Sequence, residues 1–142
     1  MRGWGTGSRG WRGRGLMSEV RSYRDLLVWQ RAMDLALAVY SLSRSFPECE
    51  RFALVSQLRR AAVSVPSNIA EGHARSSTRD FLRFLSIAAG SLAEIETQLL
   101  LSHRLDYVDA QRMNVTLKDA DELGRMIRGL QASLSSRLAD SP

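Results

Sequence analysis

The stretch that decides the fold runs from Gln57 to Gly72 and reads QLRRAAVSVPSNIAEG. Its apolar residues recur at every third or fourth position, the spacing of one face of an amphipathic helix. We expect this helix to span roughly residues 50–71 and to end at Gly72, because glycine is the commonest residue just after a helix.

Pro66 lies inside this predicted helix. A proline there has no backbone N–H and crowds the carbonyl of Ala62, which usually costs about 3 kcal/mol. The sequence therefore predicts a kink at Pro66, with Ser67 and Asn68 supplying polar groups that satisfy the interrupted backbone. A ligand-binding role for Asn68 together with Glu71 is the alternative interpretation.

A second helix is predicted before this one, from near Asp25 to the residues before Pro47, with Asp25 as its N-cap. Its apolar residues cover more of the circumference than the stripe of about 100° that a surface helix needs. The excess predicts a homo-oligomer whose interface is formed by the second of two rows. The first row is Leu26, Trp29, Met33, Ala36, Leu37 and Tyr40, and the second is Val28, Ala32, Leu35, Val39, Leu42 and Phe46.

Two further helices follow. One is predicted to open at Ser77, which has Asp80 at the spacing of a capping box, and the other opens after Asp109. A run of small residues around Gly90 favours close packing of another helix over a binding groove. Four amphipathic helices with short connections predict an all-α, up-and-down four-helix bundle.

Composition and charge limit the class of protein. A chain of 142 residues with 44% hydrophobic residues fits one globular domain, and its single cysteine excludes an internal disulfide and a multi-cysteine zinc site. The sequence has no apolar run of the roughly 18 residues that a membrane span needs, and no apolar core of a secretory signal. We therefore expect a cytoplasmic protein with no membrane partner.

The net charge of +5 comes mostly from residues 1–16, which contain four arginines and no acidic residue. We expect this Arg/Gly-rich tail to be disordered and residues 17–142 to form the bundle. Either the tail binds single-stranded nucleic acid through its arginines with Trp4 and Trp11, or translation begins at Met17. The Gly5–Gly10 segment matches a dinucleotide-binding motif, but no predicted strand precedes it.

The residues that could support catalysis are few. His73 and His103 are the only histidines, and neither forms the Glu-x-x-His pair of metal-binding bundles. Cys49 stands between Glu48 and Glu50, whose charges disfavour a thiolate. The sequence therefore predicts no enzymatic activity, no metal and no cofactor.

The chain resembles a bacterial family of four-helix-bundle proteins encoded in intervening sequences of 23S ribosomal RNA genes, over about residues 20–138. The resemblance is carried by Tyr23–Trp29, Gln57–Gly72, Asp80–Ala88 and Gly90–Leu99. It implies a left-handed bundle that assembles into a ring-like homopentamer, without a cofactor or an established enzymatic activity. Related bundles are accessory proteins of diversity-generating retroelements, in which a basic pentamer engages a reverse transcriptase and nucleic acid.

Two hypotheses about function follow. In the first, the protein is an adaptor whose arginines contact the phosphates of RNA or DNA. In the second, it is a scaffold that binds protein or only itself, with the same arginines solvated or paired to Glu71 and Asp80. The arginines concerned are Arg59, Arg60, Arg75, Arg79 and Arg83.

Overall fold

The computed structural model describes residues 20–140, which form four long α-helices and no strand. The predicted tail at residues 1–16 lies outside this range. The helices are α2 (Leu27–Ser43), α3 (Leu54–Ala74), α4 (Thr78–Arg104) and α5 (Ala110–Ala139), with single 3-10 turns η2 (Tyr23–Asp25) and η3 (Glu48–Glu50). The all-α prediction is confirmed.

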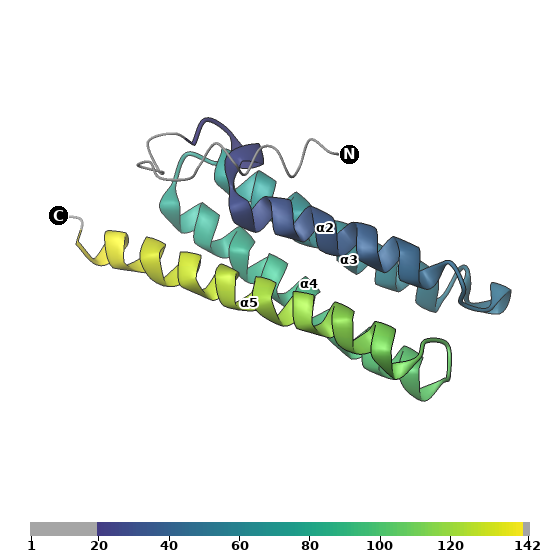
Figure 1. Cartoon of the computed structure of the whole chain (residues 1–142). Coiled ribbons are helices and arrows are strands. Elements are labelled where there is room, and N and C mark those ends of the chain that lie inside the picture. The colour runs from purple at the N-terminus through teal and green to yellow at the C-terminus, as the bar shows by residue number, and fades with distance from the viewer. Residues whose placement is uncertain (1–19, 141–142) are drawn as a thin grey trace.

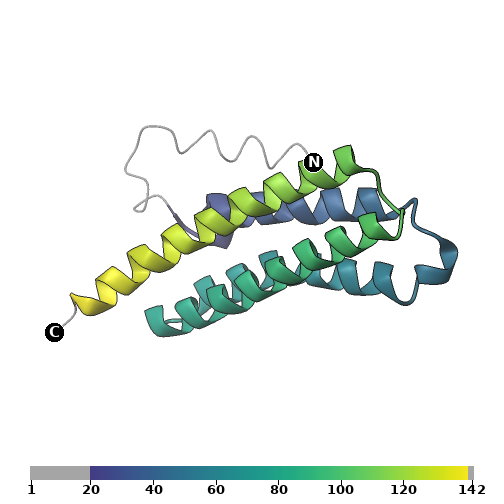
Figure 2. The same cartoon turned by 90° about the horizontal axis from the view of Figure 1, so that it is seen from below.

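Successive helices run in opposite directions, so the connection is up-and-down as predicted (Figure 1). Each helix packs against its neighbours in sequence, and α2 also packs against α5, which closes the bundle. Figure 2 shows the C-terminal turns of α5 extending past the connection between α3 and α4.

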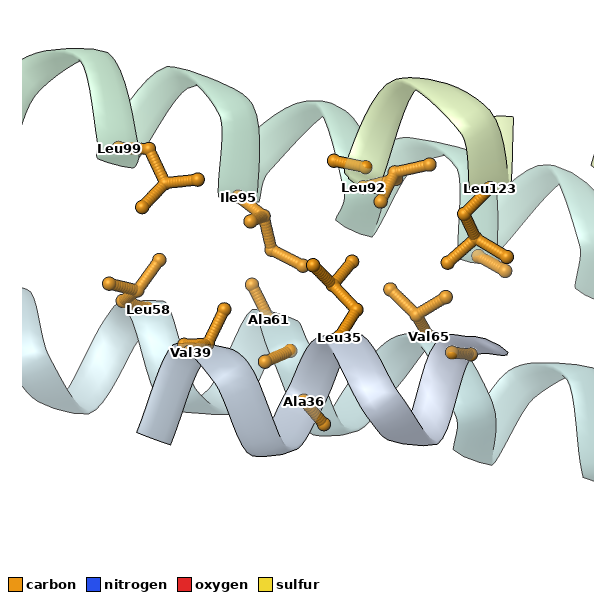
Figure 3. Close-up of a cluster of buried hydrophobic side chains, with 14 of the residues drawn as sticks. Leu35, Ala36, Val39, Leu58, Ala61, Val65, Leu92, Ile95, Leu99 and Leu123 are labelled. Carbon is orange, nitrogen blue, oxygen red and sulfur yellow. The ribbon is translucent and has the colours of Figure 1, made fainter. Parts of the chain in front are cut away.

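The core lies along the bundle axis and takes side chains from all four helices. In Figure 3, Leu35 and Val39 of α2 point into the cluster, whereas Ala36 points away from α4. The largest side chains that are almost completely buried are Leu58, Ile69, Leu85, Ile95, Leu99, Leu123 and Ile127. These residues belong to the stripes that the helical periodicity predicts.

The second apolar row of α2 belongs to this core, which corrects the predicted oligomer interface. The chain's own helices already cover these residues, so they have almost no surface left for another subunit. None is more than 7% exposed: Val28, Leu35, Val39, Leu42 and Phe46. We call this second row, including Ala32, the core row.

Two of the three predicted N-caps are confirmed, and α3 begins at Leu54 rather than near residue 50. The Ser77 hydroxyl accepts a hydrogen bond from the Asp80 N–H at 3.0 Å, and the Asp109 carboxylate accepts one from the Arg112 N–H at 2.8 Å. Asp25 does not cap α2. Together with Ser22 it forms a capping box around η2, and α2 begins only at Leu27.

Gly72 does not end α3, which continues to Ala74. A Cβ atom at Gly72 would lie 2.7 Å from the Phe84 Cβ, so glycine is required here for the close approach of α4. Gly90 is the opposite case, because a Cβ atom there would have no neighbour within 4 Å. The close packing expected around Gly90 is therefore made by its buried neighbours Ala88 and Ser91.

The helix α3 continues through Pro66. The Asn68 side-chain amide donates to the Ser64 carbonyl at 2.8 Å and to the Ser64 hydroxyl at 2.9 Å, and that hydroxyl lies 2.8 Å from the Ser91 hydroxyl of α4. Asn68 thus bonds to the backbone of α3 and supports the α3–α4 contact, but its acceptor is Ser64 and not the Ala62 carbonyl that Pro66 leaves without its helical donor. The kink at Pro66 stays a prediction.

The sequence was expected to contain no segment long and apolar enough to span a membrane, but α4 meets a criterion based on length and mean hydropathy. By length and composition alone, α4 could cross a membrane. The side chains of its buried face, such as Leu85, Ile95 and Leu99, are used in the bundle core, and core helices commonly meet the same criterion.

Candidate functional site

An apolar groove of about 460 Å³ runs between α2 and α3. The first apolar row of α2 forms one wall, and α3 forms the other. The residues of α2 that line it are Trp29, Met33, Ala36, Leu37 and Tyr40, which we call the groove row, and those of α3 are Val63, Pro66, Ser67 and Ala70. Tyr23 closes one end with its ring edge-on to Trp29, the two ring centroids lying 5.2 Å apart.

This α2–α3 groove leaves large apolar side chains uncovered. Leu37 is 52% exposed, Val63 is 44% exposed and Tyr40 is 40% exposed. A contiguous apolar surface of this kind is typical of a site that another molecule covers. The excess of apolar surface that the sequence predicts on α2 is therefore present, but on the groove row rather than the core row.

The five predicted arginines form two groups. Arg59 and Arg60 lie in the N-terminal half of α3, whereas Arg75, Arg79 and Arg83 lie at the turn into α4. At a rise of 1.5 Å per residue, the helix separates the two groups by about 22 Å. The two groups are therefore separate sites.

At the α3–α4 turn, the guanidinium groups of Arg75 and Arg83 lie 5.0 and 4.8 Å from the ring centroid of Phe84. Arg75 pairs with Glu71 at 2.9 Å, and Arg83 lies 3.8 Å from Asp80. These are the ion pairs that the scaffold hypothesis predicts. Arg79 is exposed and takes part in no ion pair within residues 20–140.

At the other end of α3, Arg59 is held in place by α2. Its Nε donates to the Ser43 hydroxyl at 2.9 Å, its Nη2 donates to the Tyr40 carbonyl at 3.3 Å, and its guanidinium lies 4.6 Å from the centroid of the Tyr40 ring. A cation at this place also interacts favourably with the C-terminal end of the α2 dipole.

A second groove, of about 560 Å³, opens beside Arg59. We call it the basic groove, and its lining residues are Tyr40, Arg51, Phe52, Val55, Ser56, Arg59, Arg60, Val63 and Ser64. Phe52 is 86% exposed, and the Arg51 guanidinium lies 5.1 Å from its ring centroid. Sequence reasoning missed Arg51 and Phe52, for which the available signal was an aromatic residue outside the apolar stripe of α3.

A small cavity with a mostly polar lining lies between α2 and α5. It is lined by Arg31, Asp34, Asp119 and Glu122 together with Leu35 and Leu123, and Arg31 lies 3.7 Å from Glu122. Partial burial raises the pKa of Asp34, the Asp119 carboxylate raises it further, and Arg31 opposes both effects. Within residues 20–140, no group of three or more His, Cys, Asp or Glu side chains could hold a metal ion.

Both histidines occupy the last turns of helices. The His73 ring meets Phe81 edge-on, with the ring centroids 5.6 Å apart, and the His103 Nδ1 lies 3.0 Å from the Val108 carbonyl oxygen. Cys49 is exposed in η3. These contacts give the two imidazoles structural roles at helix ends.

Comparison with known proteins agrees with this fold. The model of a family described as "23S rRNA-intervening sequence protein" matches residues 24–129. A solved structure of a protein with unknown function, from the S23 ribosomal protein family of Bacteroides thetaiotaomicron, has a TM-score of 0.70 and 22% sequence identity. The alignment covers 75% of this chain and 96% of that one, and at this identity it shows the fold alone. No curated protein matches the chain.

Proposed function

The chain belongs to the 23S rRNA-intervening sequence protein family, and on that premise we propose that it is a non-enzymatic, self-associating helical bundle that engages RNA or DNA. The proposal has two parts. One concerns the surface that joins the subunits, and the other concerns the arginines that contact phosphates.

Self-association uses the α2–α3 groove. Leu37, Tyr40 and Val63 are large, partly exposed and adjacent, and covering them with a second copy of the chain removes apolar surface from water. If the groove receives a different surface of the neighbouring copy, the contact is heterologous, and repeated contacts form a ring when the rotation between copies closes. The family resemblance implies that this ring has five subunits.

The observation that carries the nucleic-acid part is the state of Arg60 and Arg79. Both are exposed, and within residues 20–140 neither forms an ion pair with a carboxylate, nor does Arg59. Their charges are therefore available to phosphates without the loss of an internal pair. In a ring, several copies of such a modest site bind one strand together and gain affinity from their high effective concentration.

A second candidate function is a protein-binding scaffold. It is favoured by the apolar lining of the α2–α3 groove and by the pairing of Arg75 with Glu71 and of Arg83 with Asp80. In this case the groove is occupied by a partner protein, such as a reverse transcriptase, and the arginines remain solvated.

The test measures binding of the full chain to fluorescein-labelled RNA and DNA by anisotropy, across a series of salt concentrations. We expect the binding constant to fall steeply with salt, because each phosphate contact releases condensed counterions. The double variant Arg60→Glu and Arg79→Glu should lose most of this affinity. The matched control is the double variant Arg112→Glu and Arg128→Glu, which makes the same change of net charge at two exposed positions of α5.

Two results would contradict the proposal. If the wild-type chain binds neither RNA nor DNA at low salt, the scaffold function is favoured. If the double variant keeps the wild-type affinity, Arg60 and Arg79 do not make the phosphate contacts and the proposal is wrong.

A further inference from the structure

We propose that the basic groove binds single-stranded nucleic acid, with a base stacked on Phe52 and phosphates held by Arg51, Arg59 and Arg60. This inference rests on the proposed function and deepens it, because it names the substrate class and assigns it to one end of α3. Three features of the groove support this assignment: the exposure of Phe52, the position of the arginines and the positive charge of the lining.

Phe52 is the first element of the site. It precedes α3 by two residues, in the turn after η3, and at 86% exposure it is the most exposed of the large hydrophobic residues that the structure describes. The Arg51 guanidinium lies 5.1 Å from the ring centroid, and the remaining ring surface is open. An exposed aromatic ring beside a cation provides a surface on which an unpaired base can stack.

Tyr40 and Arg59 form the second, more rigid element. Arg59 is fixed by its hydrogen bonds to the Ser43 hydroxyl and the Tyr40 carbonyl, at 2.9 and 3.3 Å, with its guanidinium over the Tyr40 ring. Its contacts with α2 therefore orient the side chain before a ligand arrives, so that little conformational entropy is lost on binding.

The charge of the groove is the third element. Its lining includes three arginines, and among the residues that the structure describes no acidic side chain lines it. Arg51 does pair with Glu48 at 3.2 Å, but both side chains are mostly exposed, so a phosphate can replace this carboxylate at little cost. The groove therefore combines a positive lining with the exposed aromatic ring of Phe52.

The arginines of the α3–α4 turn lack an exposed aromatic ring, and this difference explains why the basic groove prefers single strands to duplexes. There, Phe84 is only 7% exposed and lies beneath Arg75 and Arg83, so no base can reach its ring. Those arginines can contact only phosphates, which duplexes and single strands share. Stacking on Phe52 requires a base with a free face, which a duplex offers only at its ends.

The experiment compares the full chain with its Phe52→Ala variant. The probes are a fluorescein-labelled 20-mer of uridine, a 20-mer of thymidine and a 20-base-pair duplex with sealed ends. We expect Phe52→Ala to weaken binding of the single strands at least about fivefold, the loss of one stacked base, and to leave duplex binding unchanged. The Phe52→Trp variant should restore single-strand binding. The matched control is Val115→Ala, which shortens another exposed apolar side chain, on α5.

The outcomes separate this inference from the proposed function. If Phe52→Ala binds single strands as the wild type does, while the Arg60→Glu and Arg79→Glu variant binds poorly, the inference is wrong and the proposed function stands. If the wild type binds no probe, both fail. If Phe52→Ala changes the mass measured by light scattering, Phe52 is a subunit contact and the inference is overturned.

Discussion

The core row and the groove row lie side by side on one helix, yet the bundle treats them differently. Leu35 and Val39 of the core row are at most 3% exposed, whereas Leu37 of the groove row is 52% exposed and Tyr40 is 40% exposed. Both rows look equally apolar in the sequence. The difference teaches that periodicity can show a surplus of apolar surface without showing which part of it the chain itself covers.

The cause is the position of the neighbouring helices. The core row faces the bundle axis, where side chains of α3, α4 and α5 meet it (Figure 3). In the groove row, Trp29 and Ala36 are also buried, but Leu37 and Tyr40 border the groove, where the small residues Pro66, Ser67 and Ala70 of α3 leave them partly exposed. The groove is therefore the place where the fold leaves apolar surface to another molecule.

The largest expected effect sharpens this contrast within the chain. Leu35→Ala should lower the free energy of unfolding by about 2–5 kcal/mol, because it leaves a cavity in the core. Leu37→Ala should change the stability of the isolated chain by less than about 0.5 kcal/mol, because water already reaches this side chain. Urea unfolding followed by circular dichroism measures both variants.

Protein concentration provides the control for that comparison. If the groove row joins subunits, the apparent stability of the wild type rises with concentration, and that of Leu37→Ala rises less. Equal losses of stability for Leu35→Ala and Leu37→Ala at low concentration would show that the chain itself covers both rows equally, which would contradict this account.

A smaller effect tests the same contrast between covered and open positions at two glycines. Gly72→Ala should cost about 1–3 kcal/mol, because the new methyl group meets the Phe84 Cβ at 2.7 Å and the Phe81 Cδ1 at 3.0 Å. Gly90→Ala, the matched control, should stabilise α4 by up to about 1 kcal/mol, since alanine favours helix and has free space there. Thermal unfolding measures the stability of both variants. A Gly72→Ala variant more stable than the wild type would contradict the close approach of α4.

Local signals in the sequence predicted the helices well. Ser77 and Asp109 cap the helices assigned to them, because a cap depends only on the next three residues. Asp25 shows the limit of this reasoning. Its carboxylate accepts from the backbone N–H groups of Arg21 and Ser22, at 2.9 and 3.3 Å, and so caps the preceding turn.

Features that depend on a second helix could not be predicted in the same way. A glycine at the end of an apolar pattern is expected both at a helix terminus and at a close contact, and only the position of Phe84 on α4 explains Gly72. The separation of the arginines into two groups could have been predicted from the sequence, because about fifteen residues of helix separate Arg60 from Arg75. The exposure of Phe52 depends on the turn before α3, and the sequence indicates only that this aromatic residue lies outside the apolar stripe of α3.

The central claim is that copies of the chain associate through the groove row. The most direct test is the mass of the wild type and of Leu37→Glu, measured by light scattering after size exclusion, with circular dichroism as the check on folding. We predict a wild-type mass of five chains, and for Leu37→Glu a folded single chain, because a buried unpaired carboxylate is costly. A wild type that is monomeric at all concentrations, or a Leu37→Glu variant that keeps the wild-type mass, would contradict the claim.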